Sequence, residues 1–406
     1  MTLSGTSRAA LQPFFWEEFV PGQPYAGRDL AALRGGWEHE PGTVAAMRSL
    51  HRVRRTDSDR AQGQVTASFA AEHTALVLFA VHQGATGRAH QQHIGLGTAC
   101  RRLVLAGAVP DAGGRRDLSD VGLERLLAGA AAGRRLANAA TAEDVDELAH
   151  HLRALVGLLR QAGIGLDYTR LFHDLRSWPG PRRGRTVRAW GLQYADRVGT
   201  RAPGPGPSVG AADRTAPAAG PRPGDGPFWE RYDARVQAAG GALAALRSGV
   251  SREAGAVPAL WLHYRAKVSA VQQQEGFLGR ELAAEHAALA LFGMHQQGRV
   301  EPMHVKGRSP GSACRLLLAR DPKADRIAVE RFFGVLVTSV DAGELAHHLG
   351  ALVRRLRQPG IGLDYTGLAQ ALVDWDHPWR PDEQSRIRAR WDHDFRVPLP
   401  VPSAQP

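Results

Sequence analysis

One stretch of 29 residues occurs twice in the chain and constrains its fold more than any other feature. Residues 150–178 read HHLRALVGLLRQAGIGLDYTRLFHDLRSW, and residues 347–375 read HHLGALVRRLRQPGIGLDYTGLAQALVDW. Each residue of the second copy lies 197 positions after its counterpart in the first, and GIGLDYT is identical in both copies. A match of this length at a fixed period indicates an internal duplication, so the chain contains two versions of one structural unit.

The repeat has the pattern of two helices joined by a short turn. Leucines recur at i, i+4, i+7 and i+11, which predicts one apolar stripe on an amphipathic helix. They are Leu148, Leu152, Leu155 and Leu159 in copy one, and Leu345, Leu349, Leu352 and Leu356 in copy two. A threonine followed three residues later by an aspartate, at Thr141 and Asp144 and again at Thr338 and Asp341, resembles a capping box before each helix.

The turn of the repeat carries its own signals. Gly163 and Gly360 supply the left-handed geometry that ends a helix. Asp167 and Asp364 follow, and we expect them to cap the second helix rather than to act as catalytic acids, because each stands alone. The repeat is therefore predicted to be an αα-hairpin.

The rest of the chain repeats in the same order, which predicts the domain organisation. Residues 71–83 match 284–296 as a nearly apolar and hence central helix, and 95–101 match 309–315. Copy one carries about 17 extra residues, which we expect to form an insertion loop around Asp111 to Asp117. No segment of sufficient length alternates apolar and polar residues as a β-strand does. The predicted fold is all-α: two tandem homologous helical-bundle domains, 14–198 and 227–397, a flexible Pro/Gly/Ala-rich linker, 199–226, and disordered ends, 1–13 and 398–406.

Composition and the lack of visible targeting signals lead us to expect a cytoplasmic protein with two folded domains. The 406 residues are enough for two domains, and 43% hydrophobic content is enough for two cores. Cys100 and Cys314 occupy matching positions and form no CxxC pair, which is typical of buried thiols rather than of a disulfide framework. No signal peptide and no long apolar run is visible.

The chain is basic, with a net charge of +11, which suits a polyanionic partner. The alternative is a GC-rich genome that favours arginine, and the small number of lysines supports it. Basic residues that recur in both copies are the candidate phosphate contacts, since arginine makes forked, charge-assisted hydrogen bonds to phosphate. The candidates are Arg34, Arg52, Arg54, Arg101, Arg134, Arg160 and Arg188 in copy one, and Arg247, Arg265, Lys267, Arg315, Arg331, Arg357 and Arg388 in copy two.

Catalytic chemistry is not indicated. The histidines lack zinc spacing, and no HExxH, GxSxG, Walker or dinucleotide motif occurs. His173 and Asp174 resemble the core dipeptide of a metal-dependent phosphohydrolase, but copy two has Gln370 and Ala371 there. We therefore expect no catalytic residue, no metal and no cofactor. The alternative is a metal-dependent nuclease or phosphohydrolase that uses His173, Asp174 and other histidines.

The order of these motifs resembles the CasB family, the small subunit of the type I-E CRISPR surveillance complex, Cascade. The resemblance rests on LFAVHQ and LFGMHQQ, on GLGTACRRL and SPGSACRLL, on the main repeat with its LDY motif, and on the closing basic-aromatic tails. It covers nearly all of each copy.

The resemblance implies a non-catalytic, all-helical subunit that functions in antiviral defence. Its partners would be the backbone and large Cascade subunits, the CRISPR guide RNA, the target DNA and the displaced strand. Its basic faces would stabilise this R-loop, with no membrane involved. The chain would replace a pair of protomers, and we expect it to be a monomer when free.

Overall fold

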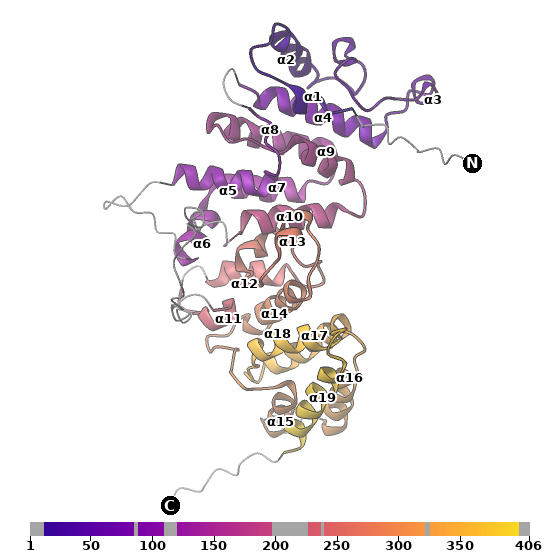
Figure 1. Cartoon of the computed structure of the whole chain (residues 1–406). Helices are drawn as coiled ribbons and strands as arrows, with labels where there is room; N and C mark the ends of the chain where they lie inside the picture. The colour runs from indigo at the N-terminus through magenta and orange to yellow at the C-terminus, as the bar shows by residue number, and fades with distance from the viewer. Residues whose placement is uncertain are drawn as a thin grey trace, which may run out of the picture. The chain divides into compact units, whose positions relative to one another are not determined.

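The computed structural model describes residues 12–84, 88–108, 120–196, 226–236, 239–320 and 325–397. The chain divides into two compact units (Figure 1). The first comprises residues 1–200 with 274–276, and the second comprises 201–273 with 277–406. The predicted arms, 1–13 and 398–406, the linker, 199–226, and the loop around Asp111 to Asp117 lie wholly or almost wholly outside the described residues.

Both units are helical. The first contains α1 (Phe15–Glu18), α2 (Ala26–Gly35), the 3₁₀ turn η1 (Ala45–Met47), α3 (Asp57–Ala61), α4 (Ala67–His82), α5 (Leu96–Gly107), α6 (Asp120–Gly129), α7 (Ala131–Thr141), α8 (Val145–Gln161), α9 (Tyr168–Ser177) and α10 (Arg183–Tyr194). In the described part of the chain the only β pairing is two single bridges, His90 to Leu166 and His304 to Leu363. The all-α prediction is therefore confirmed.

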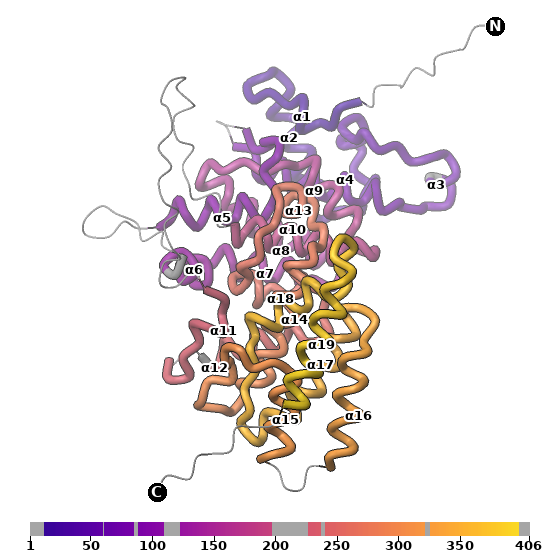
Figure 2. The backbone as a smooth tube through the Cα atoms, turned by 60° about the horizontal axis from the view of Figure 1, so that its bottom comes forward, coloured from indigo at the N-terminus to yellow at the C-terminus, as the bar shows by residue number. Residues whose placement is uncertain are grey.

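The second unit repeats this series without a counterpart of α6 among its described residues. It contains α11 (Phe228–Arg231), α12 (Ala239–Arg247), η3 (Pro258–His263), residues 270–273 of α13 (Ala270–Glu275), α14 (Arg280–Gln296), α15 (Pro310–Arg320), α16 (Arg326–Val337), α17 (Ala342–Arg357), α18 (Tyr365–Asp374) and α19 (Pro381–Arg396). The hairpin α17–α18 packs on α14, and α19 packs along α15 (Figure 2).

The apolar helices α4 and α14 are central, as predicted. Most residues of each are buried, because α4 packs against α2, α8 and α9, and α14 packs against α12, α17 and α18. The leucine stripe of α8 is buried throughout, as is that of α17. Cys100 and Cys314 are also buried, and burial raises the pKa of each thiol to about 12. These thiols therefore belong to the cores.

The shared GIGLDYT motif attaches each hairpin to its central helix. Gly163 has φ 66°, the left-handed conformation that ends α8. In the residues that follow, Asp167 caps α9 by accepting from the N–H of Arg170, which confirms the predicted cap. The hydroxyl of Tyr168 lies 2.9 Å from Nδ1 of His82 on α4. The same contact is 2.8 Å long between Tyr365 and His295.

The start of each long helix is set by the aspartate and not by the threonine that precedes it. Asp341 is the N-cap of α17 and accepts from the N–H of Glu344, whose carboxylate accepts from the N–H of Val340. The hydroxyl of Thr338 instead donates to carbonyl oxygens of α16. The prediction that the threonine caps the long helix was therefore wrong by three residues. The threonine instead lies at the C-terminal end of the preceding helix.

We expect Asp341→Ala to cost about 1 kcal/mol in the free energy of unfolding of the second domain, because it removes an N-cap acceptor. Thr338→Ala is the matched control. It removes only a side-chain bond to carbonyls that the helix already uses, so its cost is expected to be below about 0.5 kcal/mol. Urea unfolding compares the two, and an equal or larger cost for Thr338→Ala would refute the cap assignment.

Residues 120–129, part of the segment of copy one that has no counterpart in copy two, form a helix, α6, that the sequence did not predict. α6 lies between α5 and α7, whereas in the second domain only residues 321–325 separate α15 from α16. Leu123 and Leu127 of α6 are buried. The inserted segment therefore adds to the core of the first domain.

Candidate nucleic-acid interface

A buried glutamate on the central helix holds one basic segment in each domain. In the first domain, Glu72 on α4 is fully buried, and its two carboxylate oxygens accept from the backbone N–H groups of Arg52 and Val53, both at 2.8 Å. Nδ1 of His51 lies 3.2 Å from the same carboxylate. A buried carboxylate that accepts several hydrogen bonds fixes the backbone around it.

The second domain repeats this arrangement. Glu285 on α14 is buried and accepts from the N–H groups of Arg265 and Ala266, at 2.7 Å in each case. Tyr264 stands where the first domain has His51, and its hydroxyl contacts Nδ1 of His286 instead, at 2.8 Å. We call this pair of hydrogen bonds from backbone N–H groups to a buried glutamate the clamp. It is common to both copies, although the residue before the clamped segment differs.

Each clamped segment presents a cation to solvent. Arg54 and Lys267 follow the clamped residues at matching positions, and both are exposed. In the first domain Arg54 borders a groove of about 700 Å³ together with Arg48, Arg55 and the ring of Phe69. An open groove with three guanidinium groups fits a phosphate backbone, because arginine binds phosphate through forked hydrogen bonds.

Many of the other shared arginines bind carbonyl oxygens within their own domain. Arg34 donates to Ala80 and Gln83 at the end of α4, at 2.8 and 3.1 Å, and Arg160 donates to Val81 at 3.3 Å. A cation at a helix C-terminus is stabilised by the unpaired carbonyl groups there. The same kind of contact is made by Arg134, Arg265, Arg315 and Arg388, to Gly129, Leu262, Val397 and Ser339.

Two of the candidates are buried. Arg101 is 4% exposed and Arg188 is 3% exposed. Burial lowers the pKa of Arg101. Neither side chain is placed to reach an external phosphate, so we leave both out of the contacts proposed below.

The remaining candidates lie on the surface or at its edge. The guanidinium of Arg52 stacks on the ring of Phe14, 4.2 Å from its centroid, and Arg357 contacts the side chain of Gln297 at 3.2 Å. Arg247 is half-buried and Arg331 is exposed. The structure thus brings the shared cations together only in part. Arg54 and Lys267 are the two that are exposed on a segment fixed by a buried glutamate.

Arg48 and Arg55 of this groove were not among the contacts predicted from the sequence. Their counterparts in copy two are Trp261 and Val268, so a search for basic residues common to both copies excluded them. Their nearness to Arg52 and Arg54 in the sequence was the available signal, because four arginines occur within eight residues.

His173 and Asp174 are the candidate metal ligands of the alternative function. Among the described residues, no group of three His, Cys, Asp or Glu side chains is placed to hold a metal ion. The carboxylate of Asp174 accepts from the indole N–H of Trp190 at 2.9 Å, and burial raises its pKa to about 6. Asp174 therefore has a hydrogen-bond partner within its own domain, the indole of Trp190. In the described residues no helix is both long and apolar enough to cross a membrane.

The fold defines an all-helical protein with two homologous domains in tandem. The family model described as CRISPR-associated protein Cse2 matches residues 29–194 and 242–395, which is more than half of the chain. The chain therefore belongs to the Cse2 family of Cascade subunits and contains two tandem copies of the family unit. The crystal structure of CasB from Thermobifida fusca is similar at 27% identity, with a TM-score of 0.32, over 40% of this chain and 86% of that one. No curated protein matches the chain.

Proposed function

We propose that the chain is a non-catalytic subunit of a type I-E Cascade complex. It binds nucleic acid in that complex and stabilises the guide RNA, the target DNA and the displaced strand during antiviral defence. The observation that carries this proposal is the exposed cation on a clamped segment in each domain, Arg54 in the first and Lys267 in the second. A duplicated cation on a backbone fixed by a buried carboxylate suits phosphate contacts that do not depend on base sequence.

The domain boundaries also remain a proposal. We propose that domains 14–198 and 227–397 act as two protomers in one polypeptide, so that one chain fills two places in the complex and is a monomer when free. A segment of 28 residues, 199–226, joins the two domains. Such a link raises the effective concentration of the second domain, which supports assembly as a single unit.

We expect the purified chain to bind a single-stranded oligonucleotide of mixed sequence with an affinity that falls steeply with salt. The double variant Arg54→Gln, Lys267→Gln is expected to reduce the slope of log affinity against log salt by about 1.4, since each lost phosphate contact removes about 0.7. Fluorescence anisotropy over a salt series measures both values. All sequences should weaken alike, because phosphate contacts carry no base information.

The control is Arg28→Gln combined with Arg386→Gln. Both side chains are exposed, at 77% and 71%, and the change in net charge is the same. A slope that changes equally in the control and in the test variant would show that only net charge matters. Affinity that does not depend on salt, or a strong preference for one sequence, would refute the proposed contacts.

A further inference from the structure

One face of the helical bundle is covered in the first domain. There α6 packs on α5 and α7, and its Leu123 and Leu127 are 3% and 2% exposed. The hydroxyl of Tyr194 on α10 donates to the carbonyl oxygen of Leu127 at 2.7 Å. Gly133 on α7 leaves room for this contact, because a Cβ there would meet the Tyr194 hydroxyl at 2.3 Å. An amphipathic helix thus closes the surface formed by α5, α7 and α10.

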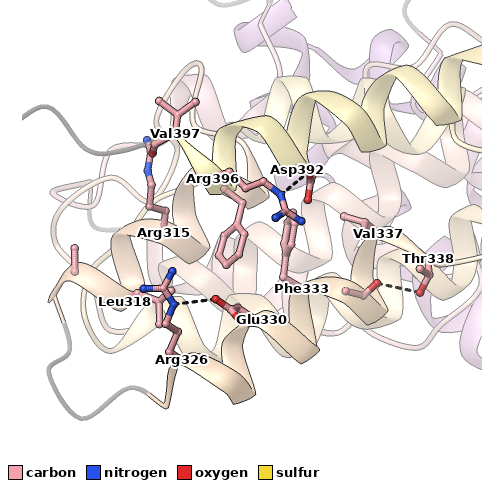
Figure 3. A pocket seen from close by; sticks show the side chains of 13 residues that line it. Arg315, Leu318, Arg326, Glu330, Phe333, Val337, Thr338, Asp392, Arg396 and Val397 are labelled. Carbon is pink, nitrogen blue, oxygen red and sulfur yellow. Dashed lines mark hydrogen bonds and ion pairs between the residues drawn. The ribbon is translucent and has the colours of Figure 1, made fainter.

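In the described part of the chain, the corresponding face of the second domain is uncovered. Its helices α15, α16 and α19 match α5, α7 and α10, but no counterpart of α6 occurs among the described residues. A groove of about 710 Å³ remains between the three helices (Figure 3). The rings of Phe333 and Phe395 stack in it with centroids 4.6 Å apart, and Leu318 and Val337 contribute to its walls.

The charged side chains around this groove have partners. Arg326 contacts Glu330 at 2.9 Å, and Arg396 contacts Asp392 at 2.8 Å (Figure 3). Arg315 donates to the carbonyl oxygen of Val397. Because two of the three cations are paired with carboxylates, the rim carries a small positive excess above an apolar floor. Such a surface suits apolar side chains flanked by a carboxylate better than it suits a phosphate backbone.

We propose that this groove, lined by α15, α16 and α19, binds an amphipathic helix of a partner protein. The helix presents leucines at i and i+4 to Phe333 and Phe395, as α6 presents Leu123 and Leu127 to the matching face of the first domain. A carboxylate beside these leucines faces Arg315. The difference between the two domains supports this binding mode independently of the proposed nucleic-acid contacts. Helix-in-groove binding of this kind is a common mode of protein recognition.

The probe is a synthetic peptide with the sequence of residues 118–130, which include α6, blocked at both ends and labelled with a fluorophore. We expect the full chain to bind it saturably, as measured by fluorescence anisotropy. Val337→Arg places a charge in the groove and is expected to weaken binding at least about tenfold. Leu318→Arg repeats the test from α15, so the result does not depend on the folding of one variant. A peptide with Leu123→Asp and Leu127→Asp is expected not to bind.

The matched control is Val335→Arg on the same helix. Val335 is 44% exposed and does not line the groove. Two residues along a helix rotate a side chain by about 200°, so position 335 faces away from position 337. We expect this variant to bind the peptide as tightly as the unmodified chain does.

Three results would overturn the proposal. The first is the absence of saturable binding up to about 1 mM peptide, or binding that neither groove variant weakens. The second is an oligonucleotide affinity that falls with Val337→Arg, which would assign the groove to nucleic acid. The third is a concentration-dependent dimer that Val337→Arg disrupts, which would assign it to a second copy of the chain.

Discussion

Acidification from pH 7 to pH 4 is expected to lower the free energy of unfolding of each domain by about 3 kcal/mol through one buried histidine alone. His82 on α4 and His295 on α14 are 3% and 0% exposed. Burial lowers the pKa of each to about 4. In the first domain Nε2 of His82 lies 2.9 Å from the carbonyl oxygen of Ile164, and Nδ1 lies 2.9 Å from the hydroxyl of Tyr168, so a ring with its single proton on Nε2 can make both contacts. The neutral ring therefore fits the site.

Stability falls on acidification because the pKa of the histidine is higher in the unfolded chain than in the folded one. An unfolded histidine takes up a proton near pH 6.5, whereas the folded one resists protonation until about pH 4. The unfolded chain thus binds more protons in this range, so stability is complete above pH 6.5 and is lost as the pH falls toward 4. The pKa values of His73, His90 and His304 are also lowered by burial, so they add to the loss in the same direction.

Urea unfolding at a series of pH values separates the contributions. The double variant His82→Gln, His295→Gln is expected to be less stable at pH 7 but to lose less stability between pH 6.5 and 4 than the unmodified chain. His393→Gln changes an exposed histidine and is expected to leave the profile unchanged. A double variant with a profile parallel to that of the unmodified chain would contradict the assignment of these two residues.

The duplicated hairpin was predictable because the same sequence pattern of a leucine stripe, a helix-ending glycine and a capping aspartate occurs in both copies. The leucine stripe, Gly163 and Asp167 all have the roles that the sequence indicated. The added helix α6 was not predictable in this way, because residues without a counterpart in copy two cannot be compared. Its leucines follow directly after the Gly/Arg/Asp-rich run around Asp111 to Asp117, whose composition favours a loop.

The candidate site was predictable only in part, since a basic residue common to both copies has two possible reasons to recur. Arg34 binds carbonyl oxygens at the end of α4 and so has a structural contact in its own domain. Arg54 and Lys267 instead face solvent. The difference lies in tertiary contacts between segments that are far apart in sequence. The clamping glutamates were missed for the same reason, since nothing local shows that Glu72 accepts from Arg52 and Val53.

Glu285→Ala is expected to destabilise the second domain by about 4 kcal/mol, because a buried donor that loses its acceptor costs about 1–3 kcal/mol and two such donors are involved. The donors are the backbone N–H groups of Arg265 and Ala266. Glu285→Gln keeps one acceptor oxygen and is expected to lose about half as much. Thermal or urea unfolding of the full chain measures both losses.

Glu281→Ala provides the control for this clamp. Glu281 lies in the first turn of the same helix and is exposed, so its replacement is expected to change the free energy of unfolding by no more than about 0.5 kcal/mol. If Glu285→Ala cost no more than Glu281→Ala, the carboxylate would not be holding the segment that carries Lys267.

If the clamp also positions Lys267 for phosphate, Glu285→Gln should weaken oligonucleotide binding at a temperature where the domain is still folded. An unchanged affinity together with the expected loss of stability would retain the clamp and refute its role in binding.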